Sequence, residues 1–474
     1  MGEAMGGQKG KRRAPLSTAV GPLADTAPSW EELQAMLERR KAETGWTDER
    51  ADPEAGPETQ PHSLRRTFGK LAPGQEPRVK LYRDHAAWCP YSQKVWLFCE
   101  AKQIPYVLEK INMRCYGPKP ASYTAKVPSG LLPAVELDGE LITESDRIMF
   151  VLEAEFPDRP MLPPRESSEA RDAARLLQLE RRLFGAWLQW LTSGWGHAQG
   201  KAAYEDVIGE VERRLKASGP GPFFLPGDSP SLVDCSFAPF LERMNASLFY
   251  YKGFRLRGPE AGRGGKYPHL ERWFEAMEAT PWYFGTKSDF YTHAHDLPPQ
   301  LGGCAPAPGS EPCAAAIDGT DGVSWTLPLP PLSSSPEAGW VDGGDKDPVE
   351  AAHRVLANHG PIARFSARAN GPGGTQRYGA RLSDPTAKAD PTFSNSDGTH
   401  EEIADGMLRR TVHALLDREG AEAMQAQHAL DPATAASAAS AAAYLRDRVG
   451  VPRDMKYPAA RQLRAHLNHT IEGL

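Results

Sequence analysis

The sequence predicts a small α/β domain followed by an all-α domain, with an extension on each side of the pair. Strand-like and helix-like patterns alternate between residues 78 and 160, and long helical patterns replace them between residues 165 and 290. Stretches rich in Pro, Gly and Ser lie outside these two blocks. A chain of 474 residues is long enough for two or three domains.

The overall composition argues against several classes of partner. The net charge of -6 gives no general reason to expect binding to nucleic acid or to an anionic membrane. No apolar run approaches the length of a membrane span, and the N-terminus lacks the apolar core of a secretory signal. We expect a cytoplasmic protein. A plastid or another organelle is the alternative, since the basic residues among positions 9–13 could belong to a targeting peptide.

The six cysteines follow the spacing of neither a disulfide framework nor a metal site. This pattern favours a reducing compartment and predicts that no metal is bound. The six are Cys89, Cys99, Cys115, Cys235, Cys304 and Cys313.

Residues 1–77 are predicted to be an N-terminal extension that is largely disordered and contains one short helix. Ser29 and Glu32 form a capping box that opens an amphipathic helix through about Lys41. Trp30, Leu33 and Leu37 would share its apolar face.

Residues 78–160 are predicted to begin with a β-α-β unit. A strand at 79–82, a helix at 90–102 and a strand at 105–111 give this order, which places the two strands parallel. Tyr91, Val95, Phe98 and Cys99 recur at helical spacing and would face the sheet. Cys89 stands at the helix start, where free amides and the positive helix end favour a thiolate, so we expect this thiol to be partly ionised.

A β-hairpin and a helix complete the α/β domain. The Asp138-Gly139 pair separates two short strands at 132–137 and 140–143, which is a strong hairpin signal. A helix then begins near Glu144 and Ser145 and runs to about residue 156.

The all-α domain is predicted at residues 165–290. Its helical patterns cover about 166–195, 202–217, 231–245 and 267–279. Residues 300–345 are predicted to be a linker rich in Pro, Gly and Ser. Residues 346–474 are predicted to form a helical extension of unknown role, with helices near 348–359, 401–418, 433–448 and 458–471. Its Ala-rich run near 434–443 favours helix but offers little to pack against, so this extension is marginal as an independent domain.

Over about residues 78–289 this order of elements resembles the soluble glutathione transferases, which join a thioredoxin-like domain to an all-α domain. The Cys-Pro-Tyr-Ser sequence at 89–92 is similar to the cysteine-type classes, omega, lambda and dehydroascorbate reductase. Phe-Phe-Leu at 223–225, followed by Ser-Leu-Val-Asp at 231–234, is similar to the capping segment of the family's helical domain.

The resemblance implies roles for seven residues. Cys89 takes the place of the catalytic cysteine, and Tyr91 that of an aromatic residue lining the glutathione site. Leu132 and Pro133 resemble the segment whose cis-proline turns a main chain towards the cysteinyl part of glutathione.

The other three roles concern the two ends of glutathione. Glu144 and Ser145 resemble the pair that holds its γ-glutamyl end, and Lys119 falls where the omega class has a lysine that reaches its glycyl carboxylate. A cation and amide or hydroxyl donors suit these carboxylates chemically.

The implied activity is a glutathione-dependent thiol transferase or reductase. Ser92 replaces the second cysteine of a dithiol motif, and Cys99 lies about 15 Å along the helix from Cys89, too far to form a disulfide with it. A monothiol cycle follows, in which glutathione is the co-substrate and releases Cys89. The second substrate would be a protein thiol in a mixed disulfide or a small oxidant such as dehydroascorbate.

Two other functions stay open from the sequence. One is conjugation of glutathione to electrophiles, and the other is a non-catalytic binding or assembly module on a transferase fold. Dimerisation is common in this fold, so a homodimer is an additional expectation.

Overall fold

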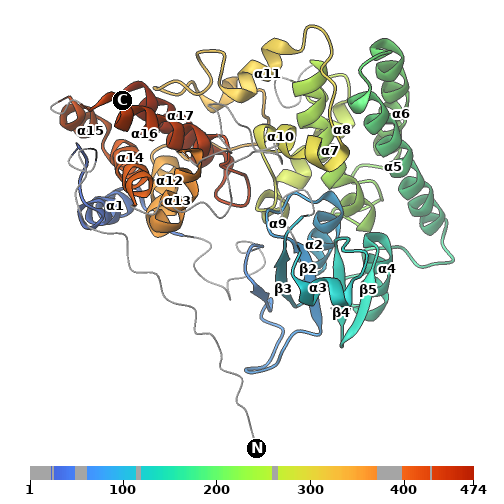
Figure 1. Ribbon diagram of the computed structural model, residues 1–474. Helices are drawn as coiled ribbons and strands as arrows, with labels where there is room; N and C mark the ends of the chain where they lie inside the picture. The colour runs from blue at the N-terminus through green and yellow to red at the C-terminus, as the bar shows by residue number, and fades with distance from the viewer. Residues whose placement is uncertain are drawn as a thin grey trace, which may run out of the picture.

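The computed structural model describes residues 23, 26–48, 61–113, 119–258, 265–370, 398–426 and 430–474. These residues form two bodies side by side (Figure 1). One body contains the sheet and the helices from α2 to α11, and the other contains α1 and the helices from α12 to α17. Each body has its own large cluster of buried apolar side chains.

The sheet has five strands in the order β1-β3-β2-β4-β5. Its strands are β1 (Arg65–Arg66), β2 (Val79–Asp84), β3 (Tyr106–Ile111), β4 (Ala134–Leu137) and β5 (Glu140–Thr143). β2 and β3 pair in parallel, whereas β2–β4, β4–β5 and β1–β3 pair antiparallel. The predicted β-α-β unit and hairpin are thus confirmed, with Asp138 and Gly139 both at positive φ in the turn.

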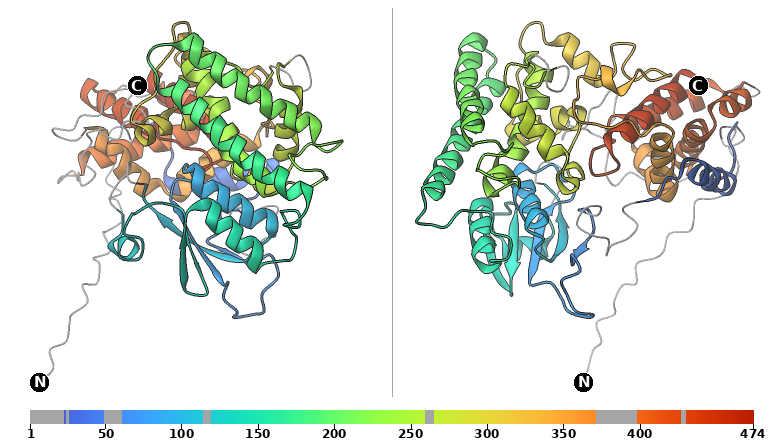
Figure 2. Two further views of the ribbon diagram at one scale, coloured as in Figure 1. Left: turned by 90° about the vertical axis from the view of Figure 1, so that its right-hand side faces the viewer. Right: turned by 180° about the vertical axis from the view of Figure 1, so that it is seen from behind.

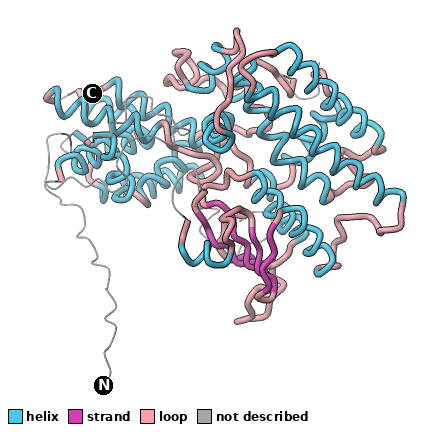
Figure 3. Tube along the Cα trace, turned by 45° about the vertical axis from the view of Figure 1, so that its right-hand side comes forward, coloured by secondary structure: helices cyan, strands magenta, loops and turns pink. Residues whose placement is uncertain are grey.

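Helices cover both faces of the sheet, which appears below the helices in Figure 3. One face packs against α2 (Pro90–Lys102) and α4 (Ser145–Glu155). The other face meets α3 (Ala121–Lys126), whose Tyr123 is buried against Tyr82 and Ile111. Alternating residues of β2 therefore enter two different apolar clusters, as the two-residue period of a strand requires.

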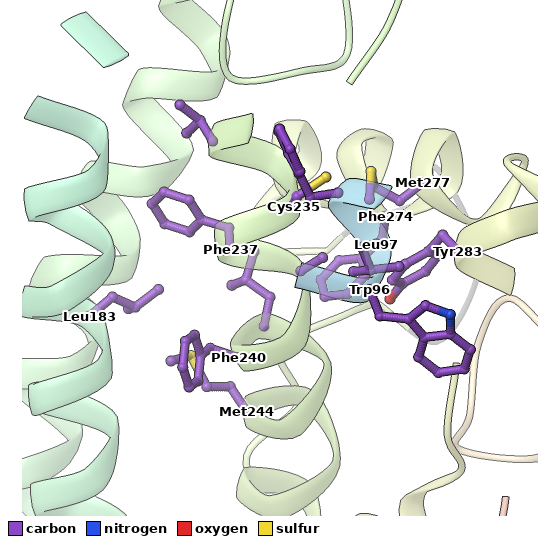
Figure 4. Close-up of a cluster of buried hydrophobic side chains, with 14 of the residues drawn as sticks. Trp96, Leu97, Leu183, Cys235, Phe237, Phe240, Met244, Phe274, Met277 and Tyr283 are labelled. Carbon is purple, nitrogen blue, oxygen red and sulfur yellow. The ribbon is translucent and has the colours of Figure 1, made fainter. Parts of the chain in front are cut away.

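The helical domain begins with two long antiparallel helices, α5 (Ser168–Thr192) and α6 (His197–Ala217), which face the viewer on the left of Figure 2. α7 (Leu232–Lys252), α8 (Pro268–Glu278) and α9 (Pro281–Phe284) follow. The α7 helix is buried along its whole length because it packs against α2, α5 and α10. Figure 4 shows Trp96 and Leu97 of α2 among the α7 and α8 side chains Cys235, Phe274 and Met277.

The predicted capping segment closes the start of α7. The Asp234 carboxylate accepts hydrogen bonds from the Ser231 amide at 2.8 Å and from the Phe224 amide at 3.1 Å. It also accepts one from the Trp273 indole at 2.8 Å. One buried carboxylate therefore joins the loop, α7 and α8.

Residues 300–345 were predicted to be a linker, but they contain helices and pack against the helical domain. α10 (Phe290–Leu301) runs into this stretch, and α11 (Glu311–Asp318) and the 3-10 helix η3 (Leu332–Ser334) lie within it. Trp325 and Ile317 are buried against the helical domain. The Pro and Gly residues fix turns in a packed segment rather than an open connection.

The extension also differs from expectation, because it has a substantial core. It contains α12 (Lys346–Ala357), α13 (His359–Ala367), η4 (Arg368–Asn370), α14 (Thr399–Leu416), α15 (Arg418–Gln425), α16 (Pro432–Arg446) and α17 (Tyr457–Glu472). The Ala-rich helix α16 packs closely against α14 and α17. The small side chains thus serve as an interface between helices, which the sequence pattern did not predict.

The N-terminal helix belongs to this second body. α1 (Trp30–Thr44) begins at the predicted capping box of Ser29 and Glu32 and packs against α12 and α14. Leu33 and Leu37 are fully buried in the same apolar cluster as the C-terminal helices. The indole of Trp30 donates a 2.8 Å hydrogen bond to Asp405 of α14.

Membrane-spanning helices, disulfides and metal clusters are all absent from the residues that the structure describes. No helix among these residues combines the length and apolarity needed to cross a membrane. Their cysteines are all free thiols, and Cys115 lies outside these ranges. Within the same ranges no group of three His, Cys, Asp or Glu side chains is placed to hold a metal ion.

Candidate functional site

Cys89 occupies the N-cap position of α2, directly after the loop that follows β2. Its φ and ψ of -72° and 116° are extended, and Pro90 is the first helical residue. The Cys89 carbonyl accepts the first helical hydrogen bond, from the Gln93 amide at 3.0 Å. The half-buried thiol lies at the positive end of α2, and its Sγ lies 4.0 Å from the Leu132 carbonyl oxygen.

The surroundings of this thiol oppose the ionisation that was expected. Burial and the nearby Asp84 carboxylate raise the pKa of Cys89 above its usual range. Hydrogen bonding from Ser92 and the positive charge of Arg243 act in the opposite direction but do not prevail. The prediction considered only the helix end, whereas the fold also places a buried carboxylate beside the thiol.

Asp84 lies at the end of β2 and is hydrogen-bonded to the loop that carries Cys89. The carboxylate is fully buried, and its Oδ2 accepts a 2.6 Å hydrogen bond from the Trp88 amide. Its Oδ1 has no hydrogen-bond partner in the part of the chain that the structure describes. Sequence reasoning missed this residue, although its place at the end of β2, five residues before Cys89, was a usable signal.

The Leu132–Pro133 peptide bond is cis, as the resemblance implied. Pro133 is buried and Leu132 half-buried just before β4. Tyr123 of α3 fixes this segment, since its hydroxyl donates a 2.5 Å hydrogen bond to the Leu131 carbonyl. Tyr123 is a second residue that the sequence analysis did not select.

Tyr91 faces the helical domain, not the sheet as predicted. Its ring lies 5.5 Å from the Phe240 ring of α7 and 6.5 Å from the Phe184 ring of α5, between centroids. The guanidinium of Arg181 lies over all three rings, 5.0–5.9 Å from their centroids. Tyr91 is thus part of an aromatic wall beside Cys89 rather than of the sheet core.

Glu144 and Ser145 lie at the start of α4. Glu144 is the N-cap residue, at a φ of 69°, and its side chain is exposed. Ser145 is 7% exposed, and its hydroxyl makes no hydrogen bond within the described ranges. The first amides of α4 and this hydroxyl together are suited to an anionic ligand group.

Lys119 lies beside α3 and is connected to the Leu132 segment through Tyr123. Its ammonium donates a 2.8 Å hydrogen bond to the Asn112 carbonyl and lies 5.7 Å from the centre of the Tyr123 ring. Its methylene groups pack beside Gly130, where an added Cβ would lie 3.4 Å from Lys119 Cδ.

A buried polar network attaches the Cys89 loop to the helical domain. Arg243 of α7 donates hydrogen bonds to the Trp88 carbonyl at 2.7 Å and to the Gln93 side chain at 2.8 Å. Gln93 donates in turn to Glu242, which accepts hydrogen bonds from the Ser288 amide and pairs with His293. Arg243 and Glu242 are about 150 residues from the Cys89 loop in the sequence, so local patterns could not predict these contacts.

The C-terminal extension also reaches this loop. The guanidinium of Arg453 lies 5.0 Å from the centre of the Trp88 ring. A Cβ added at Gly450 would lie 2.5 Å from the same ring, so only glycine allows the approach. The residue next to Cys89 is therefore covered by a segment far outside the region that carries the family resemblance.

Comparison with known proteins supports the transferase fold that the sequence resemblance implied. The model "Glutathione S-transferase, N-terminal domain" matches residues 88–155, and "Glutathione S-transferase, C-terminal domain" matches residues 179–276. The curated "Glutathione S-transferase DHAR2" of Arabidopsis thaliana is 32% identical over 169 residues, which are 35% of this chain and 72% of that protein. The chain belongs to the glutathione S-transferase family.

Two further relatives of this transferase have lower identity. "Glutathione S-transferase DHAR3, chloroplastic" of Arabidopsis thaliana is 27% identical over 168 residues, 35% of this chain and 59% of that protein. The crystal structure of Chlamydomonas reinhardtii dehydroascorbate reductase is 24% identical, with a TM-score of 0.35, and the match covers 45% of this chain and 93% of that one. Members of the family use glutathione as a co-substrate together with a second substrate.

Proposed function

We propose that this transferase is a glutathione-dependent thiol transferase or reductase in which Cys89 is the catalytic residue. The observation that carries the proposal is the position of its thiol, at the positive end of α2 and 4.0 Å from the Leu132 carbonyl. A glutathione molecule whose main chain pairs with residues 132–133 would bring its own sulfur next to Cys89. The start of α4, with Ser145, would then receive the γ-glutamyl carboxylate.

The cycle requires one thiol of the protein and two thiol exchanges. The Cys89 thiolate attacks the glutathionyl sulfur of a mixed disulfide, the old S–S bond breaks, and the second substrate leaves as its thiolate. A glutathione thiolate then attacks the Cys89–glutathione disulfide, which releases Cys89 as thiolate and forms glutathione disulfide. With dehydroascorbate, two glutathione molecules supply two electrons and become the same disulfide.

The remaining residues of the site have supporting roles in this proposal. Tyr91 would line the glutathione site and continue with Phe184 and Phe240 into the wall of the second-substrate site, below the Arg181 guanidinium, which is paired with Glu180. Glu144 would face the ammonium of glutathione. Lys119 would have to exchange its hydrogen bond with Asn112 for one with the glycyl carboxylate.

Mass spectrometry after treatment with glutathione disulfide tests the proposal. We expect a single glutathione adduct on Cys89 that excess glutathione removes. Cys89→Ser should lose both the adduct and the transferase activity. Cys313→Ser, which removes another half-buried free cysteine, is the matched control and should retain both. Full activity in Cys89→Ser would exclude the monothiol cycle.

Conjugation of glutathione to electrophiles is the alternative within the same site. A hydroxyl at position 89 can donate a hydrogen bond to the glutathione thiolate, whereas a cysteine there would form a disulfide with glutathione. We therefore expect Cys89→Ser to gain conjugating activity as it loses thiol transfer. A variant that loses conjugation while thiol transfer is unchanged would favour the alternative.

One observation favours a non-catalytic binding role as the second candidate. Burial and Asp84 raise the pKa of Cys89 above its usual range, which disfavours the thiolate that catalysis requires. This role would be supported if the protein failed to bind immobilised glutathione and if iodoacetamide alkylated Cys89 no faster than a free peptide thiol. Binding to glutathione with rapid alkylation would exclude it.

The proposal includes a reducing compartment and a homodimer. The free cysteines of the described ranges fit the cytoplasm, and one relative is named as chloroplastic. Subcellular fractionation and mass photometry of the full chain measure these two properties directly.

A further inference from the structure

A cavity lies where the helical domain meets the C-terminal extension. Its volume is about 400 Å³, within the range of small-molecule sites. Its walls come from α7, α10 and α11 on one side and from residues 321–337 and α17 on the other. None of the residues proposed above for thiol transfer lines this cavity.

The base of the cavity is aromatic and apolar. Phe249, Tyr291, Ile317 and Trp325 line it, and each is less than 5% exposed. The rings of Tyr291 and Trp325 lie 5.1 Å apart between centroids. Such a surface would bind the apolar face of a ring-containing molecule.

Two arginines of the cavity wall, Arg255 and Arg461, form no ion pair within the described ranges. The guanidinium of Arg255 lies over the Phe249 ring at 4.7 Å and forms no ion pair within the described ranges. Arg461 donates to the Pro330 carbonyl at 2.8 Å and likewise has no carboxylate partner in those ranges. Two positive charges therefore border the same space.

A third arginine is buried deeper in the wall. Arg464 is fully buried, pairs with Asp289 at 2.5 Å and lies 4.3 Å from the centre of the Tyr291 ring. Its Nε has no hydrogen-bond partner in the described part of the chain. Its charge is balanced by Asp289, so Arg255 and Arg461 supply the excess.

The acidic side chains of the wall do not cancel this excess. Asp321 accepts hydrogen bonds from the amides of Val323 and Ser324 and from the Ser324 hydroxyl, at 2.6–2.9 Å, and so holds its own turn. Burial and the charge of Asp289 raise the pKa of Glu337 to about 8, so this group is mostly uncharged at pH 7. Within the described ranges, neither of these carboxylates pairs with Arg255 or Arg461.

We propose that this cavity binds a small organic anion, a carboxylate or phosphate attached to an apolar ring. The ring would lie on Trp325 and Tyr291, and the anionic group would bind Arg255 and Arg461 through charge-assisted hydrogen bonds. Metal ions and organic cations would be repelled by the same charges. The site exists only because the extension packs against the helical domain.

Calorimetric titration of the full chain with 2-naphthoate and with its neutral amide tests the proposal. Excess S-benzylglutathione in the Cys89→Ser protein keeps the probe from both the glutathione site and the neighbouring second-substrate site. We expect one site that binds the carboxylate about tenfold more tightly than the amide, because the amide forms no charge-assisted hydrogen bond. Phenyl phosphate and inorganic phosphate distinguish the two anionic groups and the contribution of the ring.

Two variants and one control locate the site. Arg255→Gln should weaken binding of 2-naphthoate about tenfold and leave the amide unchanged. Ser333→Trp, at an exposed position of the wall, should fill the cavity and abolish binding of both probes. Arg368→Gln removes an arginine that also lies over an aromatic ring, Phe365 at 5.3 Å, but outside the cavity, and should change nothing.

Unchanged thermal midpoints of all three variants would show that the fold is intact. Equal affinity for acid and amide, absence of binding at millimolar probe, or binding that persists in Ser333→Trp would each overturn the proposal. So would an Arg255→Gln protein that binds as tightly as Arg368→Gln.

Discussion

Opposing influences act on the thiol of Cys89. The helix end, Ser92 and Arg243 favour the thiolate, whereas burial and Asp84 favour the neutral thiol. The second group prevails in the free protein. A ligand that brings hydrogen-bond donors to Cys89 would shift this balance, so the reactivity of the thiol depends on its surroundings as well as on its place in the sequence.

Asp84→Asn tests the part that one charge has in this balance. The asparagine oxygen can still accept the Trp88 amide, but the negative charge near the thiol is lost. We expect the pKa of Cys89 to fall, which raises the thiolate fraction near neutral pH. A thiolate of lower pKa is also a weaker nucleophile. The rate of alkylation by iodoacetamide should therefore rise less than the thiolate fraction, by about threefold.

The pH profile of alkylation provides the decisive measurement. Alkylation requires the thiolate, so its rate rises with pH through the pKa of Cys89, and the midpoint should move to lower pH in Asp84→Asn. Asp138→Asn, which disrupts an exposed pair with Arg78, is the matched control and should leave the profile unchanged. An unmoved midpoint in Asp84→Asn would mean that Asp84 does not influence the thiol.

Local patterns predicted the residues that one short segment determines. Cys89 at a helix start, Pro133 before a hairpin strand and Ser145 at the start of α4 lie where they were expected. Tyr91 was assigned to the sheet because helical spacing alone does not tell which side of a fully buried helix faces the sheet. Arg243 could not be found, because its hydrogen bond to the Trp88 carbonyl spans 155 residues.

At the scale of elements, start and stop signals were more informative than composition. The capping box at Ser29 and the Asp138-Gly139 pair marked a helix and a turn that the structure contains. No helix was predicted at α10, because Pro298 and Pro299 lie near its end and are typical of a linker. The packing partners of α1 were not predictable, because the helices that it contacts begin about 300 residues later.

Leu33→Ala tests whether α1 is part of the C-terminal body. Leu33 is fully buried among side chains of the C-terminal helices, and its truncation should cost about 2–5 kcal/mol of the unfolding free energy of that body. Native-state hydrogen exchange should show faster exchange in α12 and α14 and unchanged exchange in α2 and β2.

Leu64→Ala is the control for this experiment, because Leu64 is 56% exposed and its loss should change stability by less than about 0.5 kcal/mol. Unchanged protection of α12 and α14 in Leu33→Ala would show that α1 contributes nothing to the second body. Equal loss of protection in both bodies would show that they do not unfold separately.

At the scale of the whole molecule, a small polar joint connects the two bodies. Arg464 of α17 pairs with Asp289 before α10 at 2.5 Å, and both side chains are fully buried. Next to this pair, the Ser288 hydroxyl donates to the Val451 carbonyl at 2.5 Å and the Val451 amide donates to Thr292 at 3.1 Å. The neighbouring Ser288 amide binds Glu242, so the joint is continuous with the network that supports the Cys89 loop.

Arg464→Met should therefore uncouple the two bodies. The substitution leaves Asp289 buried without its cation, and breaking a buried pair from one side costs about 3–5 kcal/mol. We expect scanning calorimetry to resolve two transitions, with the earlier one belonging to the C-terminal helices. We also expect the cavity proposed above to lose its ligand.

Arg418→Met, which removes an exposed partner of Glu422, should leave the melting profile unchanged, since surface pairs contribute about 1 kcal/mol or less. A melting profile of Arg464→Met identical to that of Arg418→Met would show that packing alone, and not this ion pair, holds the bodies together.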